Sequence, residues 1–193
     1  MEQQARWPRI CGALVAAAVI VALGAPAAAL DGHQDRRGLF SGIGLGGGAA
    51  LQDGQTGGEM LLELQLGGGI TKRLTLALDI DVWFQLMDDH QNWMVVPGPE
   101  LSIFIIGGFF VRAGVGLAFV FVKQDADVEV MTPGKDPEAN DFALAFDGSV
   151  GLGYEFFVGS NLALGLAIDG DYFAIGDEED VIGLSLSFGI RYY

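Results

Sequence analysis

Residues 73–86 read RLTLALDIDVWFQL, and every second residue from Leu74 to Leu86 is apolar. A period of two places alternate residues on opposite faces of a β-strand. One face is an unbroken row of Leu, Ile, Val and Phe, while the other carries Thr75, Ala77, Asp79, Asp81, Trp83 and Gln85. Small and polar residues suit the narrow inside of a closed barrel, and a continuous apolar row suits lipid. The stretch therefore predicts a wall strand of a transmembrane β-barrel.

The same alternation recurs along the chain and predicts eight strands. They cover residues 39–51, 59–70, 74–86, 93–106, 109–122, 142–155, 162–173 and 181–193. Turn chemistry predicts short turns at 71–73, 107–108 and 158–161, and longer loops at 52–58, 88–92, 123–141 and 174–180. An even number of strands with short turns at one end is typical of outer-membrane barrels. Because an open edge would leave backbone groups unpaired in lipid, we expect an all-β, eight-stranded antiparallel up-and-down barrel.

Two local features modify this pattern. Pro97 and Pro99 cannot donate hydrogen bonds to a neighbouring strand, so we expect a bulge or a disrupted end in the fourth strand. The run GIGLGGG at 42–48 resembles a dinucleotide-binding loop, but no helical pattern follows it to bind a pyrophosphate. These glycines therefore predict a tightly curved wall.

The first 29 residues have the order of a secretory signal peptide. Two arginines precede an apolar run at 12–23, and a small-residue site ends at Ala29. The run is shorter than the about 20 apolar residues of a helical membrane span. We expect cleavage near Ala29, a polar lead-in over residues 30–38, and a barrel over 39–193. The single cysteine, Cys11, precedes the cleavage site, so the mature chain would hold no disulfide.

The composition combines strong acidity with high hydrophobicity. The chain has ten Lys and Arg against 25 Asp and Glu, a formal net charge of −15. Such a protein repels nucleic acid, and the sequence shows no basic patch to bind it. Hydrophobic residues nonetheless make up 51% of the chain, which does not fit acidic disorder. Both properties are explained if charges occupy the loops and the lumen while apolar residues face lipid.

The last strand provides the most specific pattern. Residues 182–192 alternate apolar with small or polar side chains, and the chain ends at Tyr193. Together with the pattern over 39–193, this strand resembles the small outer-membrane β-barrel superfamily of the OmpA transmembrane domain, OmpX and OmpW-like proteins. The resemblance implies a place in the outer membrane of a Gram-negative cell envelope. It also implies a C-terminal signal read by the barrel-assembly machinery, formed by Phe188, Ile190, Tyr192 and Tyr193. The apolar row is in step with the penultimate Tyr192 rather than with the terminal residue, which departs from the superfamily pattern.

The predicted lumen is rich in acids. Eight strands leave room only for side chains inside, so we expect a polar network that plugs the lumen. Its members are Glu63, Asp79, Asp81, Arg112, Asp147, Asp169, Asp171 and Arg191, with Glu100 or Glu155 pairing with the arginines. A hard cation such as Ca²⁺ is the alternative, because it takes oxygen ligands. Its candidate ligands are Asp79, Asp81, Asp169 and Asp171; beyond these we expect neither a metal nor a cofactor.

Catalysis is not expected. Acidic pairs are similar to those of barrel proteases, but the predicted inward pairs contain no histidine and that family uses ten strands. Barrel lipid A deacylases need a His–Ser pair on the wall, and no predicted strand carries a histidine. His33 and His90 fall in the lead-in and in a predicted loop.

Aromatic residues near the predicted strand ends suit two interfacial girdles. One comprises Phe84, Trp93, Phe121 and Tyr172, and the other Phe109, Tyr154, Phe156, Phe157 and Tyr192. The acidic loops are expected to be solvated, or to bind divalent cations that bridge lipopolysaccharide phosphates. The expected partners are outer-membrane lipid, lipopolysaccharide and the assembly machinery, and the expected state is a monomer.

These observations predict a structural or surface-interaction protein with a plugged lumen. One alternative is a small pore or carrier for cations or apolar molecules. Another is a barrel-embedded hydrolase that uses Asp79 and Asp169. A soluble lipocalin-like barrel is disfavoured by the seven outward apolar residues of 74–86.

Overall fold

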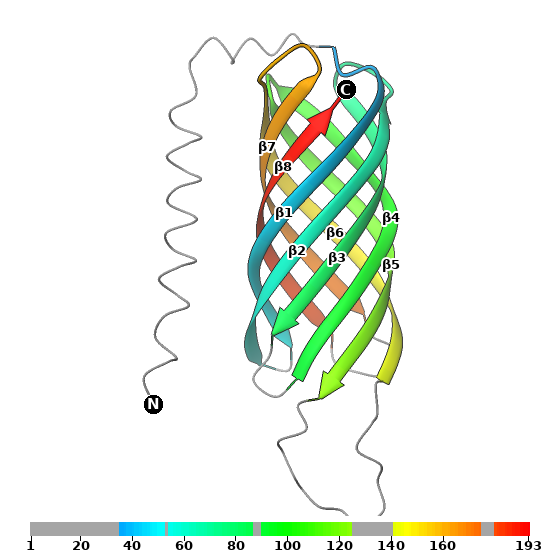
Figure 1. Cartoon of the computed structure of the whole chain (residues 1–193), viewed down its shortest axis with the longest axis vertical. Coiled ribbons are helices and arrows are strands. Elements are labelled where there is room, and N and C mark those ends of the chain that lie inside the picture. Colours follow the sequence, from blue (N-terminus) through cyan, green and yellow to red (C-terminus); the bar gives the residue numbers. More distant parts are fainter. Residues whose placement is uncertain (1–34, 53, 87–89, 125–140, 175–179) are drawn as a thin grey trace, which may run out of the picture. The chain divides into compact units, whose positions relative to one another are not determined.

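The computed structural model describes residues 35–52, 54–86, 90–124, 141–174 and 180–193. The predicted signal peptide and most of the predicted loop at 123–141 lie outside the described residues. The strands are β1 (Gly38–Gln52), β2 (Gln55–Gly69), β3 (Leu74–Leu86), β4 (His90–Ile106), β5 (Phe109–Gln124), β6 (Asp141–Phe157), β7 (Leu162–Ala174) and β8 (Val181–Tyr192). Each pairs antiparallel with the next, and β8 pairs back to β1 (Figure 1). The predicted eight-stranded all-β barrel is confirmed.

The predicted division of the strands into two faces is also confirmed. In β3, Leu76 and Leu78 are exposed, whereas the alternate residues Thr75, Ala77 and Asp79 are buried. Exposed large apolar residues recur along all the other strands. In the part of the chain that the structure describes, no helix is long and apolar enough to cross a membrane.

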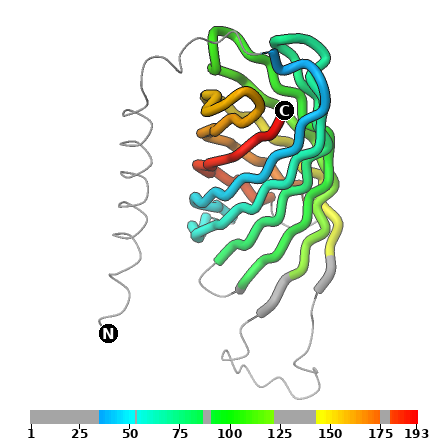
Figure 2. The backbone as a smooth tube through the Cα atoms, turned by 45° about the horizontal axis from the view of Figure 1, so that its top comes forward, coloured from blue at the N-terminus to red at the C-terminus, as the bar shows by residue number. Residues whose placement is uncertain are grey.

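The connections between strands define two ends of the barrel. The turn end holds residues 70–73, 107–108 and 158–161, and the opposite end, the loop end, is where β1, β3, β5 and β7 finish and β2, β4, β6 and β8 begin. Figure 2 shows the backbone of the successive strands that form the barrel wall between these two ends. The three turns lie where the sequence predicts them.

Two predicted loops are wrong in extent. The ladder of β1 with β2 continues to Gln52 and Gln55, so most of the predicted loop at 52–58 is strand. Gly54 in the remaining turn has a φ of 74°, which glycine adopts without strain. β4 begins at His90, so the predicted loop at 88–92 is also shorter. Residues typical of turns are part of these strands because each pairs with a residue of the neighbouring strand. The predicted contrast between short turns and long loops therefore fails for the connection of β1 with β2.

Pro97 and Pro99 do not interrupt the path of β4. The strand pairs with β3 through both prolines, and its register with β5 is the same before and after them, although residues 96–99 have no partner in β5. The shift in register lies instead between Phe104 and Ile106, beside the turn end. The bulge expected at the prolines is therefore wrong, and their missing N–H groups cost ladder bonds on one side only.

The inside of the barrel is layered. A buried apolar cluster, the apolar plug, lies toward the loop end, and its largest rings, Trp83 and Phe173, meet edge to face at 6.0 Å. Its members are Ala50, Leu61, Trp83, Met94, Val96, Ala118, Val120, Ala145, Phe173 and Val181. Charged side chains fill the lumen between this plug and the turn end. The predicted polar lumen is thus sealed on one side by hydrophobic packing.

Candidate functional site in the barrel lumen

Arg112 of β5 is the centre of the charged layer. Its Nε and Nη2 each donate to Asp169 of β7 at 2.6 Å, and its Nη1 donates to Glu63 of β2 at 2.8 Å. The same Nη1 lies 3.2 Å from Glu100 of β4. All four side chains are at least nine-tenths buried. Four strands therefore meet through one guanidinium, which satisfies carboxylates that would be costly to bury alone.

Arg191 of β8 forms a second centre nearer the turn end. Its Nε donates to Gln65 at 2.8 Å, and its guanidinium lies 3.4 Å from Glu155 and 3.7 Å from Glu100. Gln65 in turn donates to Asp79 at 3.0 Å and to Glu100 at 3.3 Å. Gln65 and Glu100 thus connect the two arginines into one network.

Arg36 closes the turn end, and sequence reasoning missed it. Its side chain is buried, its Nε donates to Glu155 at 2.8 Å, and its guanidinium carbon lies 3.8 Å from the centre of the Phe104 ring. The Tyr193 hydroxyl donates to the same Glu155 at 2.9 Å. The pKa of Tyr193 is raised mainly by burial and secondly by the charge of Glu155, so the hydroxyl keeps the proton it donates. The predicted polar lead-in therefore ends inside the barrel, as the alternation 36, 38, 40 could have indicated.

The neighbouring Arg37 differs from Arg36. It is exposed and hydrogen bonds to Asp35, and these hydrogen bonds lower the pKa of Asp35 to about 2. The two adjacent arginines thus lie on opposite sides of the wall, because the period of two extends beyond β1.

The remaining aspartates have incomplete partners. Asp79, Asp81, Asp147 and Asp171 each hold one buried oxygen that no group in the described residues hydrogen bonds. Counting the inward acids of the described strands, nine carboxylates face three arginines in the lumen. They are Glu59, Glu63, Asp79, Asp81, Glu100, Asp147, Glu155, Asp169 and Asp171, against Arg36, Arg112 and Arg191. This imbalance requires protons, water or cations to offset it.

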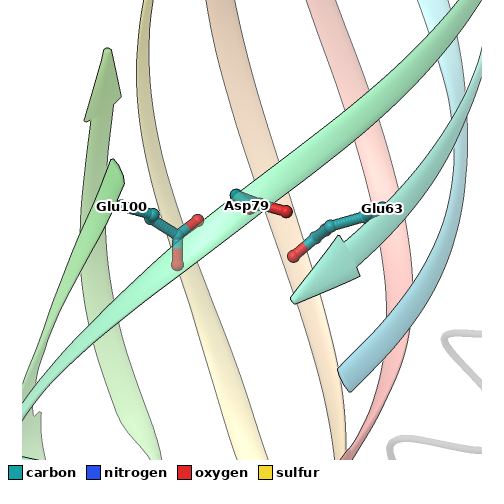
Figure 3. Close-up of side chains that lie close together, drawn as sticks. All are labelled: Glu63, Asp79 and Glu100. Carbon is teal, nitrogen blue, oxygen red and sulfur yellow. The ribbon is translucent and has the colours of Figure 1, made fainter. Parts of the chain in front are cut away.

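Glu63, Asp79 and Glu100 point toward one another from β2, β3 and β4 (Figure 3). One oxygen of each lies within 4.8 Å of the others, the spacing of a metal site. Arg112 contacts Glu63 and Glu100, however, and so already supplies the positive charge between them. Among the predicted cation ligands, Asp169 is likewise paired with Arg112 through both its oxygens. We therefore place no metal at this trio or at Asp169.

Three small cavities inside the barrel are lined by residues that the structure describes. One of about 30 Å³ lies beside Arg112 and Arg191, and two of about 20 Å³ lie beside Asp79 and Asp81. A water molecule needs at least about 10–15 Å³ measured in this way. Each cavity therefore has room for one or two waters.

One predicted girdle residue does not lie on the outer surface. Phe157, expected in an aromatic girdle, faces inward and lies 5.4 Å from the Tyr193 ring and 5.2 Å from Arg36. Trp93 is exposed as expected and contacts the Phe84 ring at 4.6 Å. His90 begins β4, so the expectation that no strand carries a histidine is wrong.

The final strand presents two kinds of residue. Phe188, Ile190 and Tyr192 are exposed on the outer face, whereas Tyr193 is partly buried against Phe40 and Glu155. The four residues predicted as one assembly signal therefore divide between the outer wall and the turn end.

A closed eight-stranded barrel with an apolar exterior and a charged lumen has the fold of the small outer-membrane β-barrels. No protein-family model matches the chain, and no curated protein matches its sequence. Among solved structures, the chain is similar to Neisserial surface protein A (NspA), with a TM-score of 0.58 and 14% identity over 80% of this chain and 96% of that one. At this identity the likeness shows the fold alone.

Two further structures match with lower TM-scores. The attachment invasion locus protein Ail of Yersinia pestis matches with a TM-score of 0.49 and 12% identity, over 81% of this chain and 99% of that one. The outer membrane enzyme PagL matches with a TM-score of 0.46 and 16% identity, over 77% of this chain and 97% of that one.

Proposed function

We propose that the mature chain spans a Gram-negative outer membrane as a closed, non-catalytic barrel with a structural or surface-interaction role. The observation that carries this proposal is the belt of exposed apolar side chains around a lumen filled with charged and apolar side chains. Leu39, Leu66 and Val150, from three different strands, expose 83%, 64% and 67% of their surface. Soluble monomers rarely expose apolar patches above a few hundred Å², so a belt of this kind fits lipid and not water.

The packing of the lumen supports a barrel that does not conduct. An ion crossing it would have to displace the Trp83–Phe173 contact, the Arg112 ion pairs and the Arg36–Glu155 pair. Each of the three cavities described above holds only one or two waters, which is less than a continuous hydrated path needs. The structural role therefore ranks above the pore or carrier.

Membrane fractionation combined with heat-modifiable gel mobility tests the membrane location. We expect the chain in the outer-membrane fraction, and a folded form whose mobility changes after boiling. A mature chain that stays folded and dissolved without detergent or lipid would overturn the proposal.

The pore remains the second candidate because nine lumenal acids against three arginines favour cations over anions. Planar-bilayer recording separates the two roles. Silence supports the closed barrel, while discrete cation-selective steps support the pore. A hydrolase would instead lose a measurable hydrolysis when Asp79 and Asp169 are both replaced by Asn.

The proposed partners follow from the same surface. The outer wall would contact lipid and lipopolysaccharide, and the exposed row of β8 would be read by the barrel-assembly machinery. We propose a monomer, because closure of β8 onto β1 leaves no unpaired edge for a second copy. Sedimentation of the detergent complex at several protein concentrations tests this state.

A further inference from the structure

Three aspartates line one small cavity beside the wall of β4 and β5. The cavity has a volume of about 20 Å³ and is lined by Asp79, Asp81 and Asp147 together with Val115. Asp79 pairs with Gly98 across the β3–β4 ladder, and Asp147 pairs with Gly116 across the β5–β6 ladder. Two glycines without side chains thus separate the carboxylates, which leaves the cavity open between them.

Each of these aspartates has a buried Oδ1 without a hydrogen-bond partner among the described residues. Asp79 and Asp147 expose only 7% and 5% of their surface. An unpaired buried carboxylate costs several kcal/mol. The apolar plug lies on one side of these acids and the Arg112 pairs on the other, so the three Oδ1 atoms are shielded from bulk water. A positive charge inside the cavity would remove this cost.

A backbone oxygen completes the site. Phe104 N donates to Arg73 O beside β3, so even-numbered residues of β4 bond toward β3 and the odd-numbered Pro97 and Pro99 face β5. Glu100 pairs with Gly114, so the next step of the same register would set the unpaired Pro99 opposite Val115, and proline has no N–H to donate to the Val115 carbonyl. A Cβ at Gly98 would lie 2.0 Å from that carbonyl oxygen. The oxygen therefore occupies the space that a side chain at Gly98 would need.

We propose that this cavity binds one hard divalent cation of the Ca²⁺ class, with ligands from Asp79, Asp81, Asp147 and the Val115 carbonyl. Carboxylate and carbonyl oxygens are the ligands that Ca²⁺ prefers, in a flexible geometry. Mg²⁺ keeps several waters, for which about 20 Å³ has no room. The three carboxylates do not all converge within 4.8 Å, as those of Glu63, Asp79 and Glu100 do. One of them would therefore reach the ion through a water.

The inference is independent of the structural role proposed above, and its rival is protonation of the same acids. Protonated aspartates would also remove the charge, but they would not respond to calcium. Calcium binding can therefore be distinguished from a stability that depends on pH alone.

The test uses the mature chain refolded in nonionic detergent with and without Ca²⁺. After desalting we expect one bound calcium per barrel by elemental analysis and a higher midpoint of thermal unfolding. In the D81N/D147N variant we expect at least about tenfold weaker binding and no calcium-dependent shift of the midpoint. A variant with Asp125→Asn, Asp127→Asn and Glu129→Gln instead removes acids of the loop that the sequence predicts at 123–141, and it should keep both responses.

Several results would overturn the proposal. One is that the wild type retains no calcium at about 1 mM, the weak end of calcium sites. Another is that D81N/D147N retains calcium as fully as the wild type. Stability that follows pH but not calcium would assign protons to the aspartates.

If D81N/D147N does not fold, terbium luminescence of the wild type decides. Trp83 lines the adjacent cavity with Asp79 and Asp81, so it should sensitise bound Tb³⁺. Ca²⁺ and not Mg²⁺ should quench this emission, and Trp83→Phe should abolish it; absence of emission contradicts the site.

Discussion

Gly151 of β6 leaves the space in which Arg112 and Asp169 pair. A Cβ at this position would lie 1.9 Å from Asp169 Oδ1 and 3.1 Å from Arg112 Cγ. We expect Gly151→Ala to displace the carboxylate and to destabilise the barrel by about 3 kcal/mol, the cost of breaking a buried ion pair. Urea unfolding in detergent measures the change. Gly148→Ala in the same strand is the matched control, because a Cβ there meets nothing within 4 Å. Equal effects of the two variants would contradict the argument.

The adjacent Arg36 and Arg37 provide a second test at the scale of single residues. Arg36→Ala removes the cation between Glu155 and the Phe104 ring, so we expect a loss of about 3 kcal/mol in unfolding free energy. Arg37→Ala breaks only an exposed pair with Asp35 and should leave the unfolding curve unchanged. If both variants behave alike, the buried position of Arg36 has no energetic consequence.

At the scale of the element, β8 combines two roles in neighbouring residues. Tyr192 is exposed on the outer face, whereas Tyr193 hydrogen bonds to Glu155 at the turn end. We expect Tyr192→Ser to lower the amount of folded protein in the outer membrane, because it interrupts the row that the assembly machinery would read. Tyr193→Phe should assemble normally and lose about 1 kcal/mol of stability with its hydrogen bond. Pulse–chase assembly and urea unfolding separate the two effects, and a normal assembly rate for Tyr192→Ser would exclude the outer row as the signal.

The strands were predictable because apolar residues alternate with small or polar residues along each of them. β3 begins and ends where the alternation of 74–86 places it. The short β1–β2 turn was not predictable, because glutamine, threonine and glycine signal a loop unless a partner strand is known. The lumen was predictable only in part. Its acids follow from inward positions, but the contacts of Trp83 with Phe173 depend on which strands face each other across the barrel. That information lies in the stagger of the closed sheet and not in any single strand.

The whole molecule depends on its apolar belt facing lipid, and one substitution tests this directly. Val150 lies near the middle of β6 and exposes 67% of its surface. Arginine at this place would set a charge near the bilayer midplane, which costs about 2–4 kcal/mol in a barrel wall. Thr56 is exposed beside the loop end and pairs with the outward-facing Leu51, so it lies on the outer face, and the same change there should cost at most about 1 kcal/mol. Val150→Arg should therefore be far less stable than Thr56→Arg when both are unfolded in lipid vesicles. The difference should shrink in detergent micelles, because they deform around a charge more readily than a bilayer does. Equal stabilities in vesicles would mean that water, and not lipid, surrounds the wall.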